Sequence, residues 1–159
     1  SDVNRKTFYQ YYECREDIVI ETCDEISQRY IEDVQHLWRT DGVLRDPEDF
    51  YRHFFKFFAQ QDAYVEQMLC NYTYNIYRLR IMQGCAEANR HRENIFVNMS
   101  VEERLLFHDY VMKNIFVLYQ RWVELGKDIP LEHLSAFAFK MCDQGMSWLR
   151  DMAPERVST

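Results

Sequence analysis

Three pairs of a carboxylate and a histidine are separated by four residues, so that each pair would share one face of a helix. The pairs are Glu32 with His36, Asp49 with His53, and Glu87 with His91. Such pairs can contribute to a metal site or form surface ion pairs. Di-iron helical bundles place Glu and His three residues apart and add further glutamates, and the nearest approach here is Asp33 with His36. We therefore interpret the three pairs as surface ion pairs and predict no metal site.

The remaining reactive residue types also lack a recognisable pattern. The cysteines are scattered without a CxxC pair or zinc-type spacing, which favours reduced and mostly buried thiols; they are Cys14, Cys23, Cys70, Cys85 and Cys142. The sequence contains no Gly-rich phosphate loop, HExxH, GxSxG or Walker motif. We predict neither catalytic residues nor a cofactor, and expect that the protein is not an enzyme.

The composition is typical of a helical domain. Glycine occurs 4 times and proline 3 times in 159 residues, while 47% of the residues are hydrophobic, enough for one sizeable core. Scarce helix breakers and long stretches of helix formers predict an all-α chain with short connections. No apolar run approaches the length needed to span a bilayer, and no signal-peptide pattern is present. We expect a cytoplasmic protein with no membrane partner.

Local start and stop signals divide the chain into helices. Asp46 followed by Pro47 predicts one helix start, Ser100 with Glu103 forms a capping box at another, and Gly126 favours a helix end. The expected helices cover about 15–38, a segment from Pro47, about 63–70, about 72–89, about 101–125 and about 130–152. In the helix after Ser100, the expected polar stripe comprises Glu102, Asp109, Lys113, Gln120 and Glu124.

The segment near the amino end carries residue types that can contact DNA. With Asn4 as the cap, Phe8 and Tyr12 fall on one aromatic face of a short helix, so the neighbouring basic and amide side chains point elsewhere. Arginine and lysine suit phosphate or guanine contacts, and glutamine and threonine can reach base edges. On spacing alone, an ordinary polar helix end with two exposed bases is an equal alternative.

The run from Val3 to Ile18 resembles the recognition helix joined to the start of the long connecting helix in tetracycline-repressor (TetR) family regulators. The matching residues are Val3, Arg5, Thr7, Phe8, Tyr9, Tyr12, Glu16, Asp17 and Ile18. Glu13 and Cys14 depart from a basic and a capping position of that pattern. Because a helix-turn-helix needs a supporting helix ahead of the recognition helix, we expect the first part of the head to be missing. The resemblance implies DNA contacts from Asn4, Arg5, Lys6, Thr7, Tyr9, Gln10, Tyr11 and Arg15.

The same resemblance implies a TetR-like helical bundle in two parts. Residues 1–14 would be the remnant of the helix-turn-helix domain, and residues 15–159 a domain that binds a small-molecule effector and dimerises. Aromatic residues make up 16% of the chain and favour an apolar or aromatic effector. The candidates for the pocket wall are Phe54, Phe58, Met68, Tyr74, Tyr77, Met82, Phe107 and Tyr110. The alternative is that these rings simply fill a core.

The last two expected helices are similar to the end of the body in some TetR-family proteins, through Arg121 to Gly126 and then Pro130 to Glu132. In that family the final two helices pair with their symmetry mates, which implies a homodimer. The expected interface comprises Tyr119, Trp122, Leu134, Phe137, Met141, Gly145 and Trp148. A monomer core containing one flexible glycine is the alternative interpretation.

The sequence therefore predicts a DNA-binding transcriptional regulator in which an effector shifts the population between two arrangements of the body. With a net charge of −7, this chain should not bind DNA specifically without the complete head. Two other hypotheses stay open. In the first, the chain would be a free-standing helical binding or interaction module whose opening motif is coincidental. In the second, it would be a small helical enzyme that uses buried carboxylate and histidine side chains.

Overall fold

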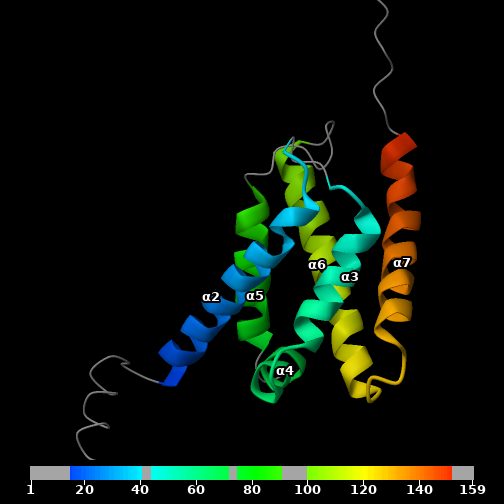
Figure 1. Cartoon of the computed structure of the whole chain (residues 1–159). Helices are drawn as coiled ribbons and strands as arrows, with labels where there is room; N and C mark the ends of the chain where they lie inside the picture. Colours follow the sequence, from blue (N-terminus) through cyan, green and yellow to red (C-terminus); the bar gives the residue numbers. More distant parts are fainter. Residues whose placement is uncertain (1–14, 41–43, 72–74, 91–99, 152–159) are drawn as a thin grey trace, which may run out of the picture.

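The chain folds as an all-α protein, as the composition predicts. The computed structural model describes residues 15–40, 44–71, 75–90 and 100–151. Helices account for 84% of these residues, and no strand occurs among them, so the expectation of an all-α chain is confirmed. The helices, which Figure 1 shows, are α2 (Arg15–Val34), the short 3-10 helix η1 (Gln35–Leu37), α3 (Pro47–Ala59), α4 (Ala63–Cys70), α5 (Asn75–Arg90), α6 (Val101–Glu124) and α7 (Leu131–Asp151).

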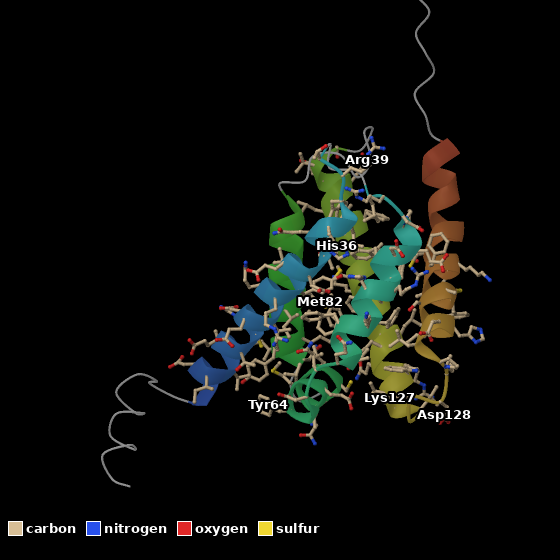
Figure 2. The ribbon with its side chains drawn as sticks, viewed as in Figure 1. His36, Arg39, Tyr64, Met82, Lys127 and Asp128 are labelled. Atoms are coloured by element: carbon tan, nitrogen blue, oxygen red, sulfur yellow. The ribbon has the colours of Figure 1, made fainter. Side chains whose placement is uncertain are left out.

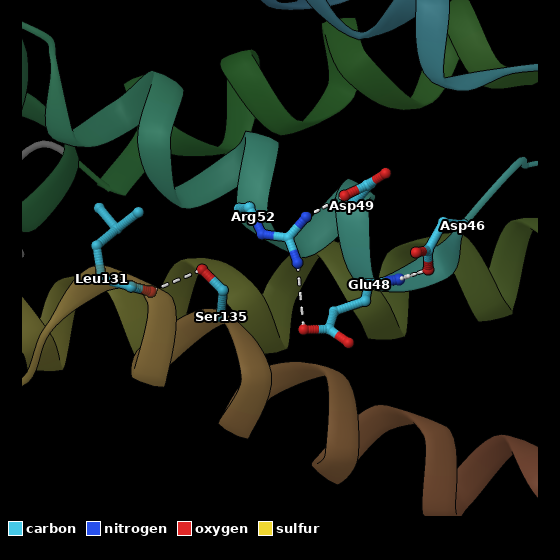
Figure 3. A network of polar contacts seen from close by, with 6 residues as sticks. All are labelled: Asp46, Glu48, Asp49, Arg52, Leu131 and Ser135. Carbon is cyan, nitrogen blue, oxygen red and sulfur yellow. Dashed lines mark hydrogen bonds and ion pairs between the residues drawn. The ribbon is translucent and has the colours of Figure 1, made fainter.

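The predicted helix starts at α3 and α6 are confirmed. The Asp46 side chain accepts a hydrogen bond of 2.9 Å from the backbone N–H of Glu48 at the start of α3 (Figure 3). At α6, the Glu103 N–H donates to the Ser100 hydroxyl at 3.2 Å, and the Ser100 N–H donates to the Glu103 carboxylate at 2.7 Å. Both motifs satisfy backbone donors that the first turn of a helix leaves unpaired. These ends are therefore fixed by the local sequence.

The end of α6 has the geometry of a Schellman motif. Gly126 adopts a positive φ of 75°, the Lys127 N–H donates to the Trp122 carbonyl, and the Gly126 N–H donates to the Val123 carbonyl. Lys127 also has a positive φ, which is uncommon for a residue with a side chain. Its ammonium group pairs with Glu66 of α4 and lies 5.7 Å from the Trp122 ring centroid. These contacts hold the α6–α7 turn against α4.

The first described helix is shorter than predicted. Instead of continuing to Trp38, α2 ends at Val34 and the chain tightens into η1 before an isolated bridge between Trp38 and Leu44. The backbone N–H of Arg45 donates to the Leu37 carbonyl at 2.9 Å, which closes this turn. The apolar period continues through the turn, because Leu37 is buried like Val34. Periodicity alone therefore could not locate the helix end.

Two helix pairs make the most extensive contacts in the bundle. α2 crosses α5, and α3 packs along α7, while α6 lies between them and contacts α4, α5 and α7 (Figure 1). The core between these helices is aromatic. Tyr30 from α2 lies 6.0 Å from Phe54 of α3, and Phe54 lies 4.9 Å from Phe116 of α6, measured between ring centroids. These three rings are almost fully buried.

Tyr119 and Gln120 are two of the polar side chains inside the bundle that have hydrogen-bond partners. The Tyr119 hydroxyl donates to the Phe58 carbonyl at 3.0 Å, and burial raises the pKa of this phenol above its ordinary value. Gln120 was expected on the polar stripe of α6 but is buried. Its amide donates to the Cys70 carbonyl at 2.8 Å and accepts from Arg78 at 2.6 Å. The stripe expectation is wrong at Gln120 because partners on neighbouring segments satisfy a polar group inside the bundle.

Replacing a ring at the centre of this core should strongly destabilise the protein. Phe58 is fully buried and touches rings from α2, α3 and α6. We expect Phe58→Ala to lower the free energy of unfolding by about 3–5 kcal/mol in urea titrations at a fixed protein concentration. Tyr64→Ala on the surface of α4 is the control and should change it by less than about 0.5 kcal/mol. Similar losses in the two variants would contradict this description of the core.

Candidate functional site

The residues expected to line an effector pocket occupy three kinds of position. Phe54, Phe58, Met68 and Met82 are buried in the core. Tyr77 and Phe107 are partly buried against it. Tyr110 is 58% exposed on α6, and Tyr74 lies outside the described residues. The structure therefore gathers most of the set in and around the core, with Met82 near the middle of the bundle (Figure 2), and leaves Tyr110 on the surface.

Within the buried set, side chains fill space against each other. The ring centroids of Phe54 and Phe58 are 4.7 Å apart, and Phe116 lies 5.0 Å from Phe58. Met68 contacts α2 through the Cys23 thiol, whose sulfur is 3.7 Å from the methionine sulfur. Burial raises the pKa of Cys23 to about 11, which leaves the thiol protonated and unreactive near neutral pH. In this arrangement the rings are part of the hydrophobic core.

The residues expected at a dimer interface divide between the interior and the surface. Tyr119, Trp122 and Leu134 are buried within the chain, and the Trp122 indole N–H donates to the Ile129 carbonyl at 2.7 Å. Phe137 and Met141 on α7 are exposed by 48% and 59%. Gly145 and Trp148 belong to α7, in the part of that helix for which only the backbone is described.

A further set of exposed apolar side chains was missed by the sequence analysis. Leu106, Tyr110 and Val117 are separated by four and seven residues and lie on one outward side of α6, which we call the outer α6 face. Leu106 and Val117 are 71% and 57% exposed. The spacing was visible in the sequence, but the helix is apolar over most of its circumference, so spacing could not tell which side is buried. Exposed apolar groups on one face are typical of an association surface.

Two of the three histidines in the expected pairs, His36 and His53, make contacts across helices, and His91 lies outside the described residues. The imidazole of His53 on α3 lies 3.8 Å from the Asp33 carboxylate on α2, and its ring centroid is 4.7 Å from that of His36 in η1. Along α3, Asp49 pairs with Arg52, which also contacts Glu48 (Figure 3). Figure 2 marks His36 near the end of α2. Among the described residues, no group of three or more His, Cys, Asp and Glu side chains is arranged to hold a metal ion.

Of the expected DNA-contacting residues, one falls on a described helix. Asn4, Arg5, Lys6, Thr7, Tyr9, Gln10 and Tyr11 lie outside the described residues, and Arg15 is the first residue of α2. The described part of α2 exposes more acidic than basic side chains: Glu21, Glu25, Glu32 and Asp33 against Arg29, while Asp24 is paired with Arg80 of α5. An excess of negative charge disfavours contact with a nucleic acid backbone. None of the described helices is both apolar enough and long enough to cross a membrane.

Comparison with known proteins returned no relative. No protein-family model, curated protein or solved structure matched the chain.

The contact between His53 and its neighbours should make stability depend on pH. Partial burial lowers the pKa of His53, with His36 and Lys56 acting in the same direction and Asp33 and Asp49 opposing them. The unfolded chain therefore binds a proton more readily than the folded chain. The contribution of neutral His53 to stability is fully present above pH 6.5, the ordinary pKa of histidine. It is lost as the pH falls from 6.5 toward the lowered pKa of His53.

Urea titrations between about pH 8 and about pH 5 measure this effect. We expect His53→Gln to lose less stability than the wild-type protein on acidification, with the difference confined to the range below 6.5. His133→Gln, at an exposed position on α7, controls for loss of a surface histidine and should follow the wild-type protein. Parallel curves for wild type and His53→Gln would contradict the prediction.

Proposed function

We propose that this chain is the effector-binding and dimerising body of a TetR-like transcriptional regulator, with the DNA-contacting residues near its amino end. The resemblance of residues 3–18 to the recognition and connecting helices motivates the proposal. The structural observation that carries it is the pair of long final helices, α6 and α7, which both expose apolar side chains on an all-α body. No catalytic role is proposed.

Homodimerisation is the part of the proposal with the most direct structural support. The outer α6 face presents Leu106 and Val117 to solvent, and α7 presents Phe137 and Met141. These are side chains that a folded protein normally shields when several lie on adjoining helices. A twofold-symmetric contact uses the same patch on both partners, so α6 and α7 of one chain would pack on α6 and α7 of its twin. Four packed helices would then cover all four side chains.

DNA recognition is assigned to the amino-terminal motif. Arg5 and Lys6 supply phosphate or guanine contacts, and Thr7 and Gln10 supply contacts to base edges. The acidic surface of α2 and the net charge of −7 keep the body itself away from DNA. The connecting helix α2 would then set the separation of two heads in the dimer, and hence the spacing of the half-sites that they read.

Effector binding is assigned to the interior of the body. Because the buried rings fill the space between helices in this structure, an apolar or aromatic effector would have to bind an arrangement in which Tyr77, Met82 and Phe107, at and beside the core, have moved. Such a ligand stabilises that arrangement by its differential affinity for the two states. Effector binding thereby shifts the population toward the second arrangement of the body, in which α2 has a different orientation.

A helical protein-interaction module is the second candidate function. The exposed apolar side chains of α6 and α7 fit a different protein partner as well as a second copy. The oligomeric state and the DNA selectivity of the chain distinguish the two functions.

The dimer interface can be tested by placing charges on α7. Sedimentation of the wild-type chain should give a dimer, and Phe137→Asp combined with Met141→Asp should weaken association by roughly 30-fold or more, because carboxylates would be buried without partners. Tyr64→Asp changes an equally exposed aromatic residue on α4 and should leave the dimer intact. Far-ultraviolet circular dichroism checks that all variants keep their helices. A monomeric wild-type chain, or a double variant that dimerises normally, would count against this interface.

DNA binding can be tested by selecting duplexes from a random pool. The protein expressed from its full open reading frame should enrich two related half-sites, separated by about one helical turn or a multiple of it. Arg5→Ala should reduce that enrichment, whereas Arg121→Ala, an exposed arginine on α6, should not. The 159-residue chain alone should give no sequence-selective shift in a gel. Failure of the full-frame protein to enrich any sequence would remove the DNA-binding function.

A further inference from the structure

Among the glycines whose surroundings the structure describes, Gly84 makes a close approach between two helices, at the crossing of α2 and α5. Ser27 of α2 is buried and lies directly against Gly84 of α5. A Cβ atom added at Gly84 would lie 2.7 Å from the Ser27 hydroxyl oxygen and 2.8 Å from its Cβ. Both distances are shorter than side-chain atoms tolerate, so only glycine permits this crossing distance.

Polar contacts fix the same crossing in register. The Ser27 hydroxyl is 2.9 Å from the Cys23 carbonyl in its own helix and 3.3 Å from the Ile81 carbonyl of α5, to either of which it can donate. One turn away, the Arg80 guanidinium donates two hydrogen bonds, of 2.8 and 2.7 Å, to the two carboxylate oxygens of Asp24. A bidentate pair restricts orientation as well as distance. We call Asp24, Ser27, Arg80 and Gly84 the α2–α5 lock.

The contacts of α2 with α3 and α4 are less tightly fixed: apart from the Asp33–His53 pair at 3.8 Å and Arg29 at 5.9 Å from the Phe57 ring centroid, they are made by apolar and sulfur-containing side chains. Tyr30 meets α3 through the faces and edges of aromatic rings, with centroids 5.3 to 6.0 Å apart. Cys23 meets α4 through the flexible thioether of Met68. Ring contacts of this kind accept several geometries of similar energy, and methionine adapts to irregular gaps. Displacement of α2 is therefore sterically easier against α3 and α4 than against α5.

We propose that α2 and α5 move as one rigid pair, held by the α2–α5 lock, and that conformational change in the bundle shifts this pair against the aromatic layer on α3. The hydrogen bond from Arg78 of α5 to Gln120 of α6 must break or adjust in that change. Any shift of α5 is then passed directly to α2. In the regulator, this movement would transmit an effector signal from α5 to the DNA-binding head, and that part of the inference rests on the proposed function. The rigidity of the α2–α5 pair does not rest on the proposed function, because it concerns the body alone.

Pulsed electron paramagnetic resonance on the 159-residue chain can test this rigidity. Spin-labelled unnatural residues at the exposed positions Glu21 of α2 and Gln83 of α5 report the distance within the pair. Labels at Glu25 of α2 and Lys140 of α7 report the distance between the pair and the rest of the bundle. Dilution with unlabelled chain removes distances between protomers. We expect the distribution within the pair to be the narrower of the two in the wild-type chain.

Substitution at the glycine provides the matched test. Gly84→Ala should lengthen and broaden the α2–α5 distance distribution, because the added methyl group cannot fit against Ser27. Adding Ser27→Gly removes the opposing atoms and should bring the mean α2–α5 distance back toward the wild-type value. A wild-type distribution within the pair as broad as that across the bundle would overturn the proposal, whether or not Gly84→Ala folds. An unchanged distribution in folded Gly84→Ala would overturn it as well. Neither outcome depends on DNA, an effector or dimerisation.

Discussion

The burial of aromatic rings between α2, α3 and α6 is the constraint on which the rest of this structure depends. Phe54, Phe58 and Phe116 each remove a large apolar surface from water, worth about 2–3 kcal/mol per side chain. The rings also set distances, because helices separated by aromatic side chains lie farther apart than helices that meet at a glycine. The bundle therefore contains a broad aromatic layer and, at Ser27 and Gly84, one crossing that a single methyl group would obstruct.

Filling the interior with rings has a consequence for the outside of the molecule. α6 directs Phe116 and other bulky side chains inward and still carries Leu106 and Val117 on its outer face, while α7 packs on α3 and leaves Phe137 and Met141 exposed. The apolar content of the last two helices thus exceeds what a single chain covers. We propose that association through these helices covers the exposed side chains, as the proposed regulator with two DNA-binding heads would require. The same surfaces link the packing of the body to the proposed function.

Features encoded by neighbouring residues were predictable from sequence, and features that depend on distant partners were not. The cap at Asp46, the capping box at Ser100 and the glycine that ends α6 act through the backbone within a few residues, and the structure has all three. The burial of Gln120 depends on hydrogen-bond partners 42 and 50 residues away. Trp122 was predicted at an interface but is buried within the chain. Its position could not be predicted because α6 is apolar on most sides, so periodicity does not identify the buried face. The candidate DNA contacts before Arg15 lie outside the described residues and stay predictions.

The central claim is that the body forms a symmetric pair through α6 and α7. The most direct measurement places one spin label per chain at Lys140, an exposed position on α7, and records the distance between chains. The account predicts a short, well-defined distance there and a clearly longer one when the single label is moved to Glu25 on α2, away from the proposed interface. Absence of any dipolar coupling between chains labelled at Lys140, or a shorter distance from Glu25, would contradict it.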